Sequence, residues 1–283
     1  MPFVPMSELL AEAYAAGYAV PGFCVWCPEA MQTVLQVARE MRAPVILMNG
    51  PAEFPCLAPS TLAAAAHELI ARYPAQAALH LDHGESLERV QQCLDAGYTS
   101  VMLDYSTRPL AENIAALREV CSLAHPLGVT VEGEIGVVGK VEASVVEGGE
   151  ASALTDPAEA AEYVAATGVD ALAVAIGNAH GQYARLPRLD FALLERLRQA
   201  VPVPLVLHGG SGTPDADLQR AIGLGIAKVN VATDLVAGVR ESLLRQWQEG
   251  RNPWIPSAQA EAMAGMAGVV AGWIRRTGAA GRA

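Results

Sequence analysis

The chain of 283 residues is 52% hydrophobic and 17% charged, which is enough apolar material for one large core and too little charge for a disordered protein. Its 30 acidic and 19 basic side chains leave a formal charge of -11, so the molecule as a whole repels a nucleic-acid backbone or an anionic membrane surface. We expect neither as a partner, although a small anion could still bind locally. The only lysines are Lys140 and Lys228, which leaves few amines for Schiff-base catalysis.

Eight short apolar runs alternate with longer amphipathic stretches, which indicates alternating strands and helices. The runs predict strands at residues 18–25, 44–49, 77–83, 100–104, 129–136, 171–177, 203–209 and 228–233. They are almost continuously apolar, as strands are in a parallel sheet that is covered on both faces. Eight such units predict a single α/β domain over residues 1–283, a (β/α)8 TIM barrel with an N-terminal helix and an extra C-terminal helix. An open doubly wound sheet is the alternative, but no G-x-G-x-x-G turn follows the first strand.

Two segments depart from this rhythm. Residues 137–156 contain three glycines and no strong period, so we expect a long active-site loop of the kind that closes over a substrate. Residues 250–256 end the barrel, and a helix rich in small residues is expected at 257–276. That helix would pack on the outside of the barrel or reach a neighbouring subunit.

The sequence favours a cytoplasmic location. No apolar run approaches the roughly 18 residues of a membrane span, and the stretch MPFVPMSELL lacks the basic region of a signal peptide. The five cysteines form an odd set, which argues against a disulfide framework. Cys24 and Cys27 form a C-x-x-C, but Pro28 follows it in a chain too long for a thioredoxin-like domain.

Three histidines, each followed by glycine, stand at the ends of predicted strands: His83, His180 and His208. Active sites of such barrels lie at these carboxyl ends, and three converging neutral imidazoles form a catalytic zinc site. Any one of them alone would more often be a polar side chain bonded to the backbone. We expect His80, inside the third strand, to be buried and hydrogen-bonded. Strand alternation places Asp82 and His83 on opposite sides, so the strand must end or twist there.

A second group of residues is typical of a phosphate site. GGSG at 209–212 and NVAT at 230–233 offer backbone N–H groups and hydroxyls just before expected helices. Ordinary turn chemistry is the alternative. A metal beside a phosphate site suggests Lewis-acid chemistry on a phosphorylated carbonyl compound, with Asp82 placed for acid–base work. Glu142, on the expected loop, would reach the substrate on closure, or would simply be solvated.

Five sequence blocks resemble those of a known enzyme family. They are LHLDHGES (79–86), VEGEIG (131–136), LAVAIGNAHG (172–181), VLHGGSG (206–212) and KVNVATD (228–234). Their order and spacing match the family from about residue 18 to the C-terminal GAAGRA. The chain is therefore similar to the class II, zinc-dependent ketose-bisphosphate aldolases, most of all to the tagatose- and fructose-bisphosphate type.

The resemblance implies a role for each matching position. The implied zinc ligands are His83, His180 and His208, with Asp104 and Glu134 near a more buried position of the ion. Asp82 would exchange a proton with the C4 hydroxyl, and Glu142 with the carbon of the enediolate. The implied dihydroxyacetone-phosphate site consists of Gly181, Gly209, Gly210, Ser211, Asn230 and Thr233. Some of the same backbone groups bind a monovalent cation, such as Na⁺ or K⁺, in the family.

Some positions that line the substrate pocket in the family differ here. Cys24 and Cys27 stand where Asn is frequent, and Asn49 where Ser or Thr is frequent. Lys140 replaces a usual Gly of the loop. Ala232 stands where dedicated fructose-bisphosphate enzymes carry Asp or Asn, which favours the tagatose type. The reaction type is therefore more firmly implied than the substrate.

The implied reaction is reversible cleavage of a ketose phosphate, such as tagatose or fructose 1,6-bisphosphate, into dihydroxyacetone phosphate and glyceraldehyde 3-phosphate. A related aldolase acting on a deoxy, keto-acid-derived or sulfonated ketose phosphate is the alternative. A barrel that only binds a metabolite is an alternative of another class, although all ligand and acid positions are present. Because the family forms dimers or tetramers, we expect a homodimer or homotetramer.

Overall fold

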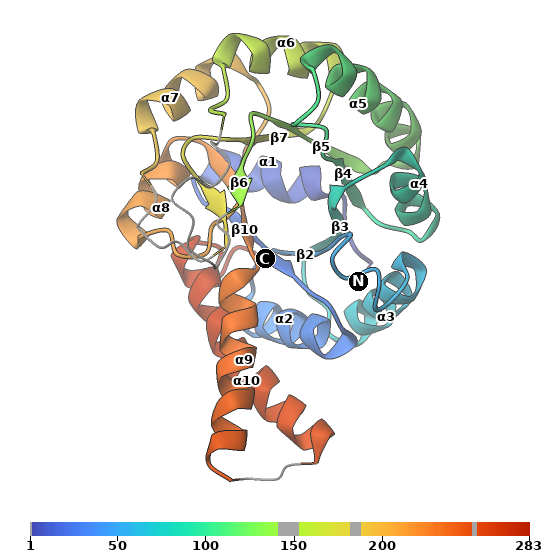
Figure 1. Cartoon of the computed structure of the whole chain (residues 1–283), viewed down its shortest axis with the longest axis vertical. Coiled ribbons are helices and arrows are strands. Elements are labelled where there is room, and N and C mark those ends of the chain that lie inside the picture. The colour runs from blue at the N-terminus through green and yellow to red at the C-terminus, as the bar shows by residue number, and fades with distance from the viewer. Residues whose placement is uncertain (1, 141–152, 182–187, 251–253) are drawn as a thin grey trace.

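The computed structural model describes residues 2–140, 153–181, 188–250 and 254–283. Within these ranges eight parallel strands close into a barrel, in the order β1-β10-β9-β7-β5-β4-β3-β2 (Figure 1). They are β1 (Val20–Cys24), β2 (Val45–Asn49), β3 (Ala77–Gly84), β4 (Ser100–Leu103), β5 (Thr130–Ile135), β7 (Ala171–Val174), β9 (Leu205–Leu207) and β10 (Ile226–Val231). Each falls at a predicted run, although β10 begins two residues before it. The predicted barrel is confirmed, and the closed strand order excludes the open doubly wound sheet.

Helices surround the barrel, one after nearly every strand (Figure 1). They are α2 (Pro28–Met41), α3 (Pro59–Arg72), α4 (Leu87–Asp95), α5 (Leu110–Ala124), α6 (Pro157–Thr167), α7 (Phe191–Ala200) and α8 (Asp215–Gly223). A short 3₁₀ turn, His125–Leu127, follows α5. The side chains of Ser86, Asp156 and Asp190 accept bonds from the first-turn N–H groups of α4, α6 and α7. These caps explain why the helices begin where they do.

Helix α1 (Met6–Ala16) closes the amino end of the barrel. The Val4 N–H bonds to the carbonyl of Ala77, the first residue of β3, and Ser7 N–H bonds to the hydroxyl of Thr130 at the start of β5. Met6, Leu9, Leu10 and Ala13 are completely buried there. The inferred N-terminal helix is therefore part of the core.

Helices α9 (Thr233–Gln248) and α10 (Ile255–Arg276) form a hairpin that projects from the barrel (Figure 1). The helix expected at 257–276 is present and begins two residues earlier. At its inner end the Trp273 indole donates to Asp234 Oδ2 at 2.9 Å, which ties the two helices together. At its outer end Trp254 is 76% exposed.

The segment expected as a loop at 137–156 begins with a short strand. β6 (Gly139–Lys140) pairs in parallel with β8 (Ala179–His180) to form a separate two-stranded sheet. Residues 141–152 lie outside the described ranges. Among the described helices, none combines the length and the apolar character that crossing a membrane requires.

Leu10→Ala should lower the free energy of unfolding by about 2–5 kcal/mol, because it leaves a cavity in the fully buried contact between α1 and the barrel. Glu12→Ala, on the exposed side of the same helix, serves as the control and should change stability by less than about 0.5 kcal/mol. Urea denaturation measures both. Equal small effects would show that α1 is not part of the cooperative core.

Candidate metal centre and active site

Three imidazoles converge at the carboxyl end of the barrel. His83 lies at the end of β3, His180 in β8 and His208 directly after β9. His83 Nε2 and His208 Nδ1 lie 2.9 Å apart, and the His180 ring centre lies 5.0 and 5.6 Å from those of His83 and His208. One ring nitrogen of each lies within 4.8 Å of the others, so the group could hold a metal ion. The structure thus brings the three predicted ligands together.

An irregularity at the end of β3 allows Asp82 and His83 to reach the same site. His83 has φ of 48°, in the left-handed region that β-strands avoid. The pairing of β3 with β4 shifts register between Leu81 and Gly84 at the same point. Asp82 Oδ1 accepts a bond from the Asn230 amide at 2.9 Å. The expected twist of the strand is present, and both side chains line one cavity.

A second candidate group consists of His83, Asp104 and Glu134. His83 Nδ1–H donates to Asp104 Oδ2 at 2.9 Å, which leaves Nε2 facing the other imidazoles. Glu134 Oε2 is buried without a hydrogen-bond partner among the described residues, 3.6 Å from His208 Nδ1. A buried carboxylate oxygen in this state is suited to a cation, so these residues fit a divalent metal.

The charges of the cluster shift one another's pKa. Burial raises the pKa of Glu134 to about 8, although His83 opposes the rise. Burial by itself lowers the pKa of His83, but Asp82 and the bond to Asp104 outweigh it and raise that pKa to about 10. For His208 burial lowers the pKa, and the neighbouring His83 lowers it further. The carboxyl groups of Asp82, Asp104 and Glu134 thus crowd around the imidazoles, and a bound cation would relieve the cost of ionising Glu134.

A buried ion pair between Glu132 and Lys228 fixes the orientation of the His208 ring. Its Nε2–H donates to Glu132 Oε1 at 2.9 Å, and Lys228 Nζ donates to Glu132 Oε2 at 2.8 Å. All three side chains are fully buried. Because Nε2 is held by the carboxylate, Nδ1 is the nitrogen left for a metal. His80 is also fully buried, with Nδ1 2.8 Å from the Ser100 hydroxyl, as expected.

Sequence reasoning missed the role of Lys228. It used the lysine only as evidence about Schiff bases, whereas the side chain is bonded to Glu132, which in turn holds His208. The signal was available: Lys228 is two residues before Asn230 on a strand and so points to the same side, into the barrel.

The loops after β9 and β10 lie against each other. Gly210 N–H bonds to the Asn230 carbonyl at 3.0 Å. Gly209 has φ of 64°, and a Cβ there would lie 2.0 Å from the Ala179 carbonyl, so only glycine fits. The Ser211 hydroxyl accepts from Asp234 N–H at 3.2 Å, in the first turn of α9. The backbone of the loop after β9 thus lies against the N-terminus of α9, an arrangement typical of a phosphate site.

The remaining predicted phosphate-binding residues lie on the same side. Thr233 is the first residue of α9 and Ala232 precedes it. Gly181 follows β8 with φ of 104°. Their assignment to substrate binding stays a prediction, as does the assignment of Gly209, Gly210, Ser211 and Asn230.

Cys24 and Asn49, two of the departures from the family pattern, have different surroundings. Cys24 lines the cavity, and its S–H donates to Glu53 Oε1 at 3.5 Å. Burial, followed by Glu53 and Asp82, raises its pKa well above the usual thiol value. Asn49 is fully buried, accepts a bond from the Tyr98 hydroxyl and is absent from the cavity wall. An effect of Asn49 on substrate would therefore be indirect.

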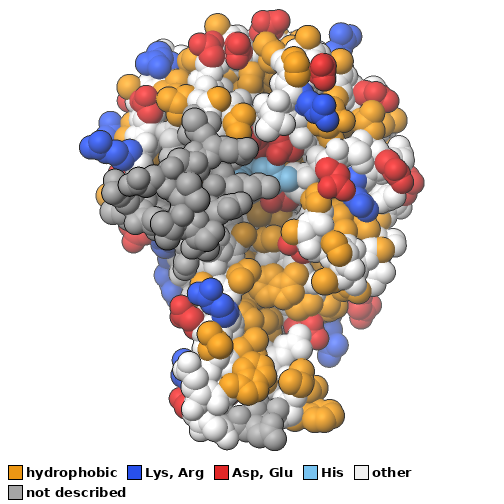
Figure 2. Space-filling model, in the orientation of Figure 1, with side chains coloured by type: hydrophobic (Ala, Val, Ile, Leu, Met, Phe, Trp, Pro, Cys, Tyr) orange, Lys and Arg blue, Asp and Glu red, His pale blue; other side chains and the backbone are white. Residues whose placement is uncertain are grey.

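The cavity over the imidazoles has a volume of about 570 Å³. Figure 2 shows histidine among acidic side chains near the centre of this face. Glu53, which sequence reasoning missed, lies in its wall; its Oε2 accepts Gly50 N–H at 2.7 Å. Glu142, the predicted proton-transfer residue, lies outside the described residues.

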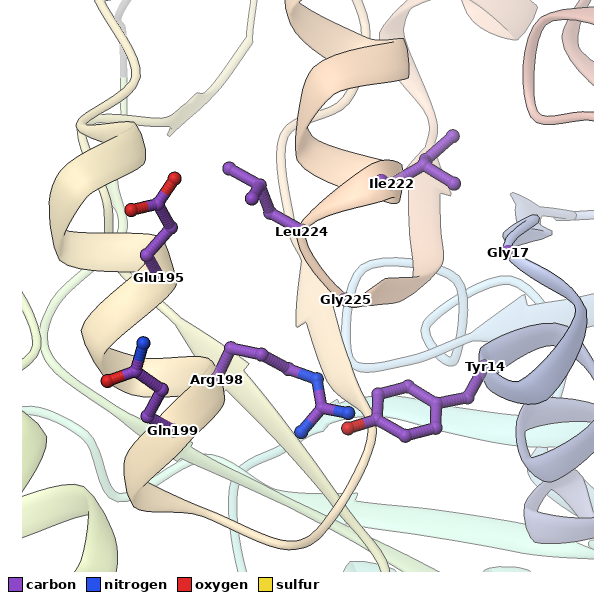
Figure 3. Close-up of a pocket in the computed structure, with 9 residues that line it drawn as sticks. Tyr14, Gly17, Glu195, Arg198, Gln199, Ile222, Leu224 and Gly225 are labelled. Atoms are coloured by element: carbon purple, nitrogen blue, oxygen red, sulfur yellow. The ribbon is translucent and has the colours of Figure 1, made fainter.

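A second cavity, of about 320 Å³, lies between α1, α7 and α8 (Figure 3). Arg198 stacks on the Tyr14 ring there, with its guanidinium carbon 4.2 Å from the ring centre. No predicted site residue lines it. The predicted site residues therefore lie at the carboxyl end of the barrel and not around this second cavity.

The family model for class II fructose-bisphosphate aldolase matches residues 4–282. The chain belongs to the class II fructose-bisphosphate aldolase family. It is thus an enzyme, a carbon–carbon lyase, and the inferred family is confirmed.

Solved structures agree with this assignment. The chain is similar to the YdjI aldolase of Escherichia coli K12, with 33% identity, a TM-score of 0.89 and 99% of each chain covered. A Coccidioides immitis protein, provisionally described as a fructose-1,6-biphosphate aldolase, has 28% identity and a TM-score of 0.85 over 97% of this chain and 96% of its own. The fold is shared with fructose-bisphosphate aldolase of Campylobacter jejuni at 21% identity, with a TM-score of 0.83 over 100% and 97% of the chains.

Lys228→Met should lower the free energy of unfolding of this class II aldolase by about 3–5 kcal/mol, because it leaves the Glu132 charge buried without its partner. The double variant Lys228→Met/Glu132→Gln removes both charges and should recover about half of that loss or more. Urea denaturation of the single and double variants gives the coupling. Strictly additive losses would contradict the ion pair.

Proposed function

We propose that this class II aldolase reversibly cleaves a ketose phosphate into dihydroxyacetone phosphate and an aldehyde. The observation that carries the proposal is the position of three convergent imidazoles beside Asp82 and next to the loops after β9 and β10, which meet at a helix N-terminus. Tagatose and fructose 1,6-bisphosphate, which would yield glyceraldehyde 3-phosphate, are the reference substrates from the family resemblance. A modified ketose phosphate is the alternative, supported by the position of Cys24 in the cavity wall.

We assign one Zn²⁺ to His83, His180 and His208, with Asp104 and Glu134 available at a more buried position. The nitrogen donors are those that zinc prefers. Such an ion supplies Lewis acidity, which polarises a carbonyl oxygen and stabilises negative charge that develops on it. A monovalent cation such as Na⁺ or K⁺ near Gly181 and Gly209 stays a prediction.

Asp82 is the acid–base group for the C4 hydroxyl in this proposal. Burial opposes its ionisation, but His83 and His208 outweigh burial and lower its pKa, so the carboxylate form is available as a base. The Asn230 amide donates to Oδ1 and fixes the orientation of the carboxylate. In cleavage Asp82 takes the C4 hydroxyl proton, the C3–C4 bond breaks, and its electrons remain on the dihydroxyacetone-phosphate half as an enediolate. Glu142 would then return a proton to carbon.

The phosphate of the dihydroxyacetone half would lie at the loops after β9 and β10. Gly209, Gly210 and Ser211 supply backbone there, and Thr233 opens the first turn of α9. The positive end of a helix and its free N–H groups bind a phosphate without a basic side chain. This explains how a protein of charge -11 attracts an anion.

Three further expectations remain proposals. A homodimer or homotetramer is supported by exposed Trp247, Trp254 and Ile255 on the α9–α10 hairpin. We also propose a cytoplasmic location and a small phosphorylated sugar as the substrate, with neither a nucleic acid nor a membrane as a partner. A barrel that only binds a metabolite is disfavoured because the metal and acid groups are brought together.

Removal of the metal should abolish activity. A chelator should stop solvent exchange of the hydroxymethyl proton of dihydroxyacetone phosphate, and zinc or cobalt should restore it, because the enediolate needs the electrophile. Proton NMR in D₂O follows the exchange, and the metal content is measured in parallel. Full exchange in metal-free protein would refute the proposed metal mechanism.

Asp82→Ala should lower kcat for aldol cleavage or condensation by roughly 10²- to 10⁴-fold, the usual contribution of a general acid–base group. The metal content should be unchanged, because Asp82 is placed outside the ligand set. Asp95→Ala, an exposed acid at the end of α4, is the control. Loss of zinc together with activity would show that Asp82 is part of the metal site.

A further inference from the structure

The two halves of the cavity are formed by opposite sides of the barrel. In the strand order, β9 lies across from β3, and β10 across from β4. A substrate anchored by phosphate at the β9 and β10 loops, with its carbonyl at the imidazoles, therefore extends toward the ends of β1 to β4. The described wall on that side includes Cys24, Glu53, Glu85, Ser106 and Thr107.

This wall contains carboxylates in addition to those of the candidate metal site. Asp82, Asp104 and Glu134 belong to the cluster around the imidazoles, whereas Glu53 and Glu85 lie on the loops after β2 and β3. Among the described residues that line the cavity there is no lysine and no arginine. A second phosphate placed here would meet carboxylates, and the described wall offers no side-chain cation to balance them.

Two arginines stand shortly after wall residues in the sequence: Arg89 after Glu85, and Arg108 after Thr107. Both contact other side chains. Arg89 lies 3.7 Å from Glu85, donates to Gln92 and stacks 4.9 Å from the centre of the Phe54 ring. Arg108 is exposed and stacks over Tyr105 at 5.6 Å. Each is thus held outside the described wall of the cavity.

The same groups suit sugar hydroxyls. The Glu53 carboxylate is fixed in the wall by Gly50 N–H at 2.7 Å and by the Cys24 thiol at 3.5 Å. A fixed carboxylate accepts short, charge-assisted hydrogen bonds from hydroxyl groups and repels phosphate. The hydroxyls of Ser106 and Thr107 add neutral partners on the loop after β4.

We propose that the aldehyde half of the substrate is a neutral polyhydroxy aldehyde without phosphate, so that the substrate is a ketose 1-phosphate rather than a 1,6-bisphosphate. Glu53 is the residue that determines this specificity. The inference rests on the proposed function, since it names the substrate class of the same site. The chemistry is unchanged: the C4 hydroxyl loses its proton, the C3–C4 bond breaks, and C3 gains a proton.

The test is condensation of dihydroxyacetone phosphate with D-glyceraldehyde or with D-glyceraldehyde 3-phosphate by the zinc-loaded enzyme. The two acceptors differ only in the phosphate. We expect kcat/KM for glyceraldehyde to exceed that for glyceraldehyde 3-phosphate by about tenfold or more, from the repulsion of like charges in a partly buried site. Preference for the phosphorylated acceptor, or condensation with neither, would overturn the inference.

Glu53→Gln keeps the shape of the side chain and removes its charge. It should move the ratio of the two kcat/KM values toward glyceraldehyde 3-phosphate by about fivefold to tenfold. Glu88→Gln, the same change at an exposed position of α4, should leave the ratio as it is. An unchanged ratio in Glu53→Gln would remove Glu53 from its proposed role.

Solvent exchange of the hydroxymethyl proton of dihydroxyacetone phosphate without any aldehyde separates this inference from the proposed function. Exchange together with preference for the phosphorylated acceptor overturns only the substrate class. Absence of exchange in the zinc-loaded enzyme overturns the aldolase proposal, and the substrate class with it.

Discussion

The buried contact of Glu132 with Lys228 and His208 connects the barrel to its chemistry. Glu132 stands on β5 and Lys228 on β10, two strands that are not neighbours in the sheet. Either charge alone would cost several kcal/mol to bury, so each requires the other. The pair therefore forms only when the sheet closes, and closure at the same time fixes which nitrogen of His208 faces the site. Folding and the positioning of His208, a proposed metal ligand, are thus one event.

His83, near the end of β3, has a backbone conformation that is energetically unfavourable but places its side chain in the candidate site. A non-glycine residue with φ of 48° stores about 1–3 kcal/mol of strain, and His83 holds this conformation through contacts to Asp104 and His208. In return, two adjacent residues of one strand present a base and an imidazole to the same cavity. A regular strand would have turned Asp82 or His83 away. Strain here is therefore tied to function.

The sequence was sufficient for the barrel because nearly continuous apolar runs and capped helices repeat along the chain. It was also sufficient for the three histidines, which stand at strand ends. It did not reveal Glu53, because that residue lies in a loop without periodicity and acquires its partners, Gly50 and Cys24, only in the folded chain. Lys228 was visible, but its role was not, because the partner Glu132 is 96 residues away. Long-range polar pairs of this kind depend on the closed strand order and not on local pattern.

The distribution of charge explains how one acidic cavity serves an anionic substrate. At the imidazoles, carboxylates gather around a position suited to a cation, and the proposed metal ion would balance their charge there. At the loops after β9 and β10, oriented backbone N–H groups supply positive potential without a basic side chain. On the side of β1 to β4, Glu53 is bonded to the Gly50 N–H and the Cys24 thiol, and no lysine or arginine stands beside it among the described residues that line the cavity. In the proposed binding mode a phosphate is thus favoured at the loops after β9 and β10 and disfavoured beside Glu53, which gives the substrate one direction in which to bind.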